Sequence, residues 1–119
     1  MKNELSPSEL RLLYIIWENE PLRSGRLSAI CLSDVGWKKS TVYTILKKIT
    51  DEGYVSNEKG NVTSIVSRQD YYHKLAKDFI DKNFSSSFPE FVAAYSDGKH
   101  LSREEILACY DAVKNYRSK

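Results

Sequence analysis

The stretch WKKSTVYTILKKITDEGYVSNEKGNVTSIVS, residues 37–67, decides the fold of this chain. Its first half has apolar residues at the i, i+3, i+4 and i+7 spacing of one helix face. These residues are Val42, Ile45, Leu46 and Ile49. Gly53 is placed to end the helix, and strand-forming residues follow at 54–55 and 62–66, with Gly60-Asn61 as a hairpin turn signal between them. The stretch therefore predicts a helix followed directly by a β-hairpin.

Two more helices are predicted before this stretch. Ser6-Pro7-Ser8-Glu9 has the pattern of a capping box with proline at the first helical position, and Pro21 ends the helix. A second helix is expected to begin at Ser24 and to stop before Gly36. Three helices followed by a hairpin are the element order of a winged helix-turn-helix. A small α+β domain of another kind is the alternative.

The polar face of the predicted helix from Lys39 to Glu52 suits insertion into a DNA groove. Lys47 and Lys48 can bind phosphates or reach a guanine edge, and Thr44 is short enough to bond a base or pack on a thymine methyl. Residues 23–60 carry seven basic and four acidic side chains, so the basic excess lies around this helix. For the two lysines, a solvated helix face is the alternative interpretation.

Three amphipathic helices are predicted after the hairpin. Asp70 is placed to cap the first, with Tyr72 on its inner face, and Ser87 and Ser102 to cap the next two. Their apolar faces are too extensive for a separate core of about 50 residues, so pairing with a second copy is expected. Folding back onto the winged helix as a monomer is the alternative. The residues expected at the dimer interface are Leu75, Phe79, Phe88, Phe91, Val92, Tyr95, Ile106, Tyr110 and Val113.

The fold class expected is therefore mainly α with a small β wing. Residues 1–69 form a winged-helix DNA-binding domain in this prediction, and residues 70–119 form a helical dimerisation region. The longest apolar run in the first third, LLYIIW, is too short for a membrane span, and the N-terminus lacks the apolar core of a signal peptide. A cytoplasmic protein with no membrane partner is expected.

No residues indicate an enzyme. His73 and His100 lie far apart in the sequence, and neither belongs to a recognisable catalytic motif. Cys31 and Cys109 are isolated and are predicted to be buried, reduced thiols. There is no metal-ligand cluster and no phosphate-binding glycine loop, so no cofactor, metal or small-molecule substrate is expected.

Two segments resemble the penicillinase repressor family of BlaI, MecI and CopY: LSPSELRLLYIIWENEP and WKKSTVYTILKKITDEGYVSNEKG. Members of that family are dimeric transcriptional repressors with an N-terminal winged helix and a C-terminal helical dimerisation region, and they bind short inverted repeats in promoters. The resemblance and the polar face of the helix together imply a DNA-binding set. It consists of Lys39, Ser40, Thr41, Tyr43, Thr44, Lys47, Lys48 and Lys59.

The chain departs from the family pattern in four places. Lys38 stands where the family often has a serine cap, so Ser40 is expected to cap the helix instead. The wing tip, commonly Gly-Arg, is Gly60-Asn61, which leaves Lys59 as the expected basic substitute. Ala94-Tyr95 replaces the Asn-Phe bond that is cut in antibiotic-responsive members, so induction by proteolysis is not implied. The cysteine-rich tail of copper-responsive members is absent.

The predicted function is that of a homodimeric, sequence-specific repressor that binds an inverted-repeat operator in double-stranded DNA through the helix from Lys39 to Glu52. The alternative is a winged-helix module for protein–protein contact, such as an anti-repressor or adaptor, without specific DNA binding.

Overall fold

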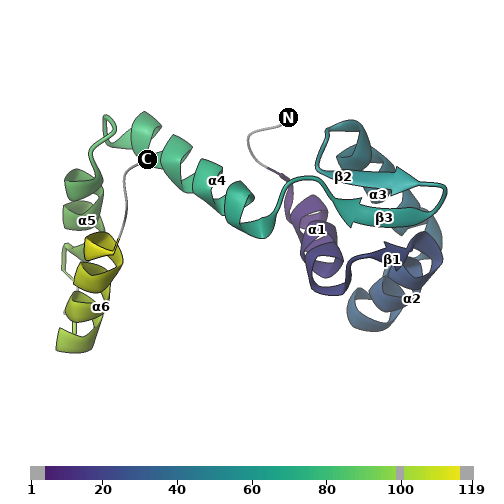
Figure 1. Cartoon of the computed structure of the whole chain (residues 1–119), viewed down its shortest axis with the longest axis horizontal. Coiled ribbons are helices and arrows are strands. Elements are labelled where there is room, and N and C mark those ends of the chain that lie inside the picture. The colour runs from purple at the N-terminus through teal and green to yellow at the C-terminus, as the bar shows by residue number, and fades with distance from the viewer. Residues whose placement is uncertain (1–4, 99–100, 116–119) are drawn as a thin grey trace. The chain divides into compact units, whose positions relative to one another are not determined.

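The computed structural model describes residues 5–98 and 101–115. Six helices and three short strands lie in this part of the chain (Figure 1). The helices are α1 (Pro7–Asn19), α2 (Ser24–Val35), α3 (Lys39–Asp51), α4 (Arg68–Asn83), α5 (Phe88–Ser96) and α6 (Arg103–Lys114). The strands are β1 (Leu22–Arg23), β2 (Val55–Glu58) and β3 (Asn61–Ser64). The predicted fold class, mainly α with a small β wing, is confirmed.

The chain divides into two compact units, residues 1–78 and residues 79–119. The first contains α1, α2, α3, the three strands and most of α4, and the second contains the end of α4 with α5 and α6. The boundary expected between residues 69 and 70 stays a prediction. None of the described helices is both long and apolar enough to cross a membrane.

The capping box predicted for α1 is confirmed. The Ser6 hydroxyl accepts from the Glu9 N–H at 3.3 Å, and the Glu9 carboxylate accepts from the Ser6 N–H at 2.8 Å. Helix α2 begins at Ser24 and ends at Val35, and the next residue, Gly36, has a left-handed φ of 76° that favours glycine. These two helices follow their local sequence signals closely.

Helix α3 begins without a side-chain cap. Its N-cap residue is Lys38, and no side chain bonds the free N–H groups there. The expectation that Ser40 caps the helix is wrong, because Ser40 already lies inside the first turn, where its carbonyl accepts from the Thr44 hydroxyl. At the other end Gly53 has a φ of 89°, as a stop signal requires.

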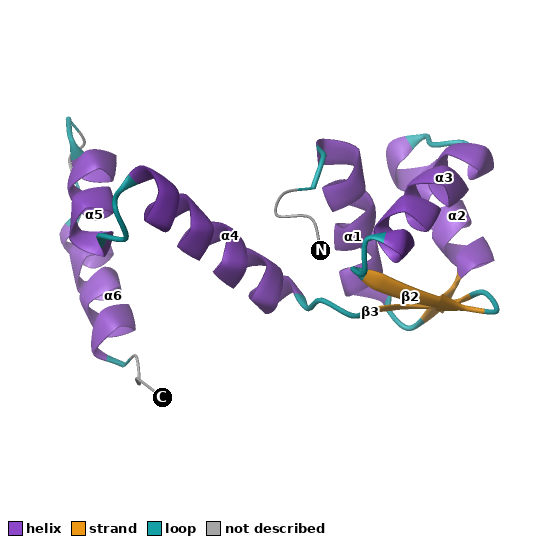
Figure 2. Ribbon diagram, turned by 90° about the horizontal axis from the view of Figure 1, so that it is seen from above, coloured by secondary structure: helices purple, strands orange, loops and turns teal. Residues whose placement is uncertain are grey.

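The three strands form an antiparallel sheet in the order β1-β3-β2 (Figure 1). Figure 2 shows the hairpin strands β2 and β3 in orange. Strand β1 was not predicted, because two residues are too few to show a strand pattern. It pairs Leu22 with Val62 and Arg23 with Asn61. The wing is therefore a hairpin with a third strand attached from the segment between α1 and α2.

The hairpin turn lies one residue earlier than predicted. Glu58 pairs with Asn61, so the two central residues are Lys59 and Gly60 rather than Gly60 and Asn61. Their φ values are 53° and 88°, both positive, as a type I′ turn requires. The Asn57 side chain also accepts from the Gly60 N–H at 3.1 Å, which stabilises the turn from within.

One hydrophobic core joins α1, α2, α3 and the sheet. The apolar residues of α3 face it, and Ile45 is partly buried at its edge. Trp17 donates from its indole nitrogen to the Val66 carbonyl at 2.9 Å and closes the core near the start of α4. The fully buried apolar residues are Leu12, Leu13, Ile16, Leu27, Cys31, Val42, Leu46, Ile49, Tyr54, Val55 and Val62.

The start of α4 belongs to this core. Tyr71 is buried while Tyr72 is exposed, so the inner position predicted for Tyr72 is wrong by one residue. Helix α4 begins at Arg68, earlier than predicted, and the Ser67 hydroxyl caps it by accepting from the Asp70 N–H. The Tyr71 ring packs against Trp17 and Tyr54. The Arg68 guanidinium lies over the Tyr14 ring, 4.3 Å from its centroid.

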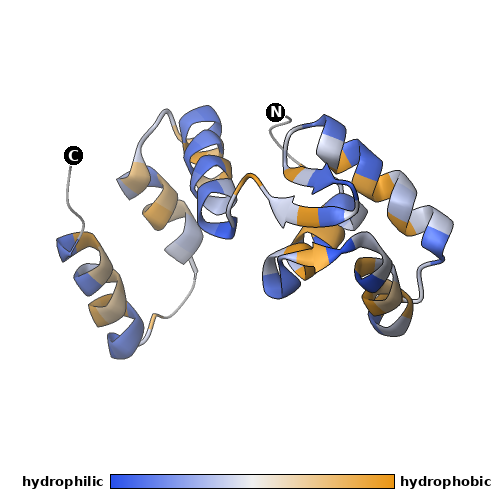
Figure 3. Ribbon diagram, turned by 45° about the vertical axis from the view of Figure 1, so that its right-hand side comes forward, coloured by the Kyte–Doolittle hydropathy of each residue, from blue (hydrophilic) through white to orange (hydrophobic). Residues whose placement is uncertain are grey.

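The second unit has no buried residue among those described in α5 and α6. Positive φ values at Ser85 and Ser86 interrupt the helical conformation between α4 and α5. The predicted caps form: the Ser87 hydroxyl accepts from the Glu90 N–H, and Ser102 begins a full capping box. Figure 3 shows hydrophobic residues along these helices. Cys109 is exposed in this chain, so its predicted burial is wrong.

Candidate nucleic-acid interface

The side of α3 that faces away from the core is polar and exposed. Because Val42, Leu46 and Ile49 anchor the helix, the opposite residues are held on a fixed surface. The exposed members of the predicted DNA-binding set on this helix are Lys39, Ser40, Thr41, Thr44, Lys47 and Lys48. Tyr43 is half-buried at one flank.

Tyr43 connects α3 to the start of α2. Its hydroxyl donates to the Ser24 hydroxyl at 3.3 Å, and the Lys39 ammonium lies 5.7 Å from its ring centroid. The phenol is thereby oriented along the flank of the helix, and Lys39 is drawn toward the same flank. Tyr43 therefore supports the geometry of the surface as well as contributing to it.

Thr44 presents a defined chemistry. Its hydroxyl donates to the Ser40 carbonyl at 2.9 Å, so the donor of this side chain is already used. The methyl group and the free lone pair of the hydroxyl stay available on the exposed surface. A thymine methyl or a base amino group matches them.

Lys47 is paired only weakly. Its ammonium lies 3.1 Å from the Asp51 carboxylate one turn later, and the two side chains are 78% and 65% exposed. Exposed pairs of this spacing contribute only about 0.3–0.5 kcal/mol. A phosphate can therefore displace Asp51, and Lys47 is the lysine best placed for that exchange.

Lys48 has a different environment. Its ammonium lies 3.4 Å from Glu9, a carboxylate that is only 3% exposed and that also closes the capping box of α1. The pair ties the end of α3 to the start of α1. Local sequence patterns cannot find such a pair, because the two residues are far apart along the chain.

The wing places one predicted residue and one unpredicted residue beside each other. Lys59 lies exposed at the centre of the turn. Arg23, from β1, crosses to the wing, where its guanidinium donates to the Asn61 side chain at 3.1 Å. The Ser24 N–H donates to the Gly60 carbonyl at 2.8 Å, which fixes the turn against the start of α2. No periodicity could have indicated Arg23, since only the strand register brings it to the wing.

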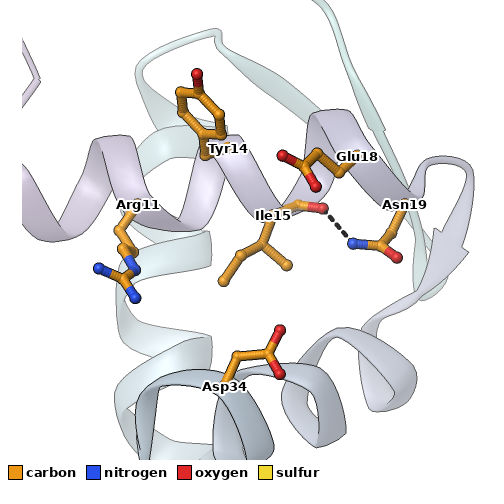
Figure 4. Close-up of a pocket in the computed structure, with 6 residues that line it drawn as sticks. All are labelled: Arg11, Tyr14, Ile15, Glu18, Asn19 and Asp34. Carbon is orange, nitrogen blue, oxygen red and sulfur yellow. Dashed lines mark hydrogen bonds between the residues drawn. The ribbon is translucent and has the colours of Figure 1, made fainter.

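Two shallow hollows lie beside helices α1, α2 and α3. One lies between α3 and β2 and is lined by Tyr43, Leu46, Lys47, Thr50, Asp51 and Asn57. The other, shown in Figure 4, lies between α1 and α2 and is lined by Arg11, Tyr14, Ile15, Glu18, Asn19 and Asp34. Neither collects a set of groups that could act on a substrate. Over the residues described, no group of three His, Cys, Asp or Glu side chains could hold a metal ion; His73 is exposed, and His100 lies outside those residues.

The predicted dimer residues fall into two groups. Leu75 packs against the core of the first unit and Phe91 is half-buried among the rings of the second. The others are exposed, with Phe79, Phe88, Val92 and Tyr95 before the last helix. On α6, Ile106, Tyr110 and Val113 are exposed as well.

A three-helix unit with an exposed polar third helix and an adjoining hairpin defines the winged-helix class of DNA-binding proteins. The penicillinase repressor family model matches residues 5–115, and the chain belongs to that family. It is accordingly a DNA-binding transcriptional repressor by family, a class of regulators rather than enzymes. A search of curated proteins found no match to this chain.

Proposed function

We propose that this protein is a homodimeric, sequence-specific repressor that inserts α3 into the major groove of an inverted-repeat operator. The observation that carries the proposal is the exposed polar face of α3, held rigidly by its buried apolar face. A rigid helix with short polar side chains and lysines on its outer face suits base reading and phosphate binding at once. Such a repressor acts where the promoters are, so we place it in the cytoplasm.

In this proposal Lys47 and Thr44 have different roles on α3. Lys47 exchanges Asp51 for a phosphate and contributes affinity to any duplex. Thr44 contacts a base edge with its methyl and its free lone pair and contributes preference for the operator. Ser40 and Thr41 lie beside them on the exposed surface and complete the reading face.

A two-fold dimer follows from the second unit. Several of its apolar side chains are more than half exposed in the single chain, among them Tyr95, Tyr110 and Val113. A second copy covers them economically, and two-fold symmetry then matches an inverted repeat. Half-sites are expected about one helical turn, roughly 34–36 Å, apart.

The test begins with duplexes selected from a random pool by the full-length protein. Binding of a selected duplex and of an unrelated duplex is measured by fluorescence anisotropy at several salt concentrations. Lys47→Ala is expected to weaken both complexes by a similar factor, since it removes a phosphate contact. Thr44→Ala is expected to weaken the selected complex preferentially. Arg11→Ala, which removes a charge from the α1–α2 hollow, is the control and should change neither.

An adaptor without specific DNA binding is the other candidate. It predicts that no sequence is enriched in the selection and that no salt-dependent complex forms. That alternative would be favoured if the wild-type protein bound the selected and the unrelated duplex with the same affinity, and if Lys47→Ala changed neither affinity.

A further inference from the structure

Arg23 is an exposed arginine at the wing with a fixed orientation. It forms the last pair of β1 with β3, opposite Asn61, and its Nη1 donates to the Asn61 side-chain oxygen at 3.1 Å. In the described part of the chain Arg23 forms no ion pair with a carboxylate. An arginine has five N–H donors, so a single amide acceptor leaves most of the guanidinium available.

Gly60 makes room for this guanidinium. A Cβ atom at residue 60 would lie 2.9 Å from Nη2 of Arg23 and 3.3 Å from its Cζ. Glycine therefore serves the turn twice: it adopts a φ of 88° and it lets the planar group approach the backbone. The guanidinium thus lies against the turn, with Asn61 as its anchor.

The wing turn is also connected to the start of α3. Ser24 donates its N–H to the Gly60 carbonyl at 2.8 Å, and its hydroxyl accepts from Tyr43 at 3.3 Å. Lys39 lies over the ring of the same tyrosine. Arg23 and Lys39 are therefore linked through Ser24 and Tyr43, so the wing and the flank of α3 present positive charge from one connected surface.

We propose that Arg23 is the phosphate-binding residue of the wing, oriented by Asn61, and that it takes the role expected of Lys59. A planar guanidinium held by one acceptor offers its remaining N–H groups to a phosphate with little further ordering. Lys59 projects from the turn itself, with no comparable anchor among the described residues. This proposal rests on the proposed function, since it concerns DNA bound by α3.

Glu58 is the opposing charge at this site. It pairs with Asn61 from the other side, so the row across the sheet is Arg23, Asn61 and Glu58. Neighbouring strands lie about 4.8 Å apart, which places the carboxylate two strands from the arginine. A bound phosphate near Arg23 would be repelled by it. Glu58→Gln is therefore expected to strengthen binding about two- to threefold.

The experiment measures the dissociation constant and its salt dependence with selected and unrelated duplexes. Arg23→Ala is expected to weaken both complexes about tenfold or more in 0.1 M salt, because each protomer loses a charged hydrogen bond. The slope of the log association constant against log salt is negative. Its magnitude should decrease by about 1.8 per dimer, since two phosphate contacts are lost. Arg11→Ala, a matched loss of one exposed arginine, should leave the slope unchanged.

Variants of Asn61 test whether this residue orients the Arg23 guanidinium or only stabilises the sheet. Asn61→Ala is expected to weaken binding about threefold in the wild-type background and to have no further effect on the Arg23→Ala variant. Thermal unfolding of each variant reports any loss of sheet stability separately. A salt slope in Arg23→Ala equal to that of Arg11→Ala overturns the assignment while the proposed function stands. A wild-type protein that enriches no sequence and binds no duplex overturns both.

Discussion

The ammonium groups of Lys47 and Lys48 are neighbours in the chain with different surroundings. Lys47 faces an exposed carboxylate, whereas Lys48 faces Glu9, which is almost fully buried. A buried carboxylate that loses a cationic neighbour becomes costly, while an exposed one is solvated by water. The sequence placed both lysines in the DNA-binding set. We expect Lys47 to bind DNA and Lys48 to contribute mainly to the stability of the fold.

Lys48→Ala is expected to lower the free energy of unfolding by about 1–2 kcal/mol, a moderate value because Lys48 itself is largely solvated. Lys47→Ala, the matched control one residue earlier, should change it by less than about 0.5 kcal/mol. Urea denaturation followed by circular dichroism measures both. Equal stabilities for the two variants would contradict a structural role for the Lys48–Glu9 pair.

The two cysteines also differ. Burial raises the pKa of the Cys31 thiol to about 11, with a further contribution from the Asp34 carboxylate. At pH 8 its thiolate is therefore scarce, and only the thiolate reacts with alkylating reagents. Cys109 is exposed. On α6, Cys109 lies on the same face as Ile106, Tyr110 and Val113, which the proposed dimer covers, so only Cys31 is predicted here. We expect iodoacetamide to leave Cys31 unlabelled in the native protein and to label both cysteines in denaturant, as peptide mass mapping will report. Rapid native labelling of Cys31 would contradict this.

At the scale of elements, the wing turn is sensitive to a single methyl group. Gly60→Ala is expected to destabilise the protein by about 1 kcal/mol, because φ is positive there and the added Cβ meets the Arg23 guanidinium. Gly25→Ala, inside α2 with no atom near its Cβ, should be neutral or stabilising. Thermal unfolding compares them. Similar melting temperatures for both variants would contradict the expected steric conflict of a side chain at residue 60.

Elements with local signals could be predicted from the sequence. A capping box located the start of α1, and apolar periodicity located α2 and α3. On the predicted inner face of α3, Val42, Leu46 and Ile49 are buried and Ile45 is partly buried. Features that depend on distant partners could not be predicted: Arg23 reaches the wing only through pairing with β3, and Lys48 meets Glu9 only after α1 packs on α3. Tyr72 was assigned to the inner face, but Tyr71 is the buried residue, because its ring packs against Trp17 and Tyr54, which are distant in the sequence.

At the scale of the whole molecule, the exposed apolar side chains of α6 make self-association testable. Ile106→Glu is expected to shift the full-length protein toward monomer in sedimentation equilibrium, because it places a charge on the proposed interface. Asp111→Ala, an exposed polar position of the same helix, is the control and should leave the dimer intact. A wild-type protein that is monomeric at all concentrations would exclude the dimer.

The position of Tyr71 has a consequence for synthesis on the ribosome. Its buried ring packs near Tyr54 and Trp17, and its hydroxyl lies 3.5 Å from the Leu5 nitrogen. A nascent chain that has emerged only as far as the hairpin therefore lacks a side chain that its core requires. Completion of the first unit must therefore wait until the first turns of α4 have followed the hairpin out of the ribosome.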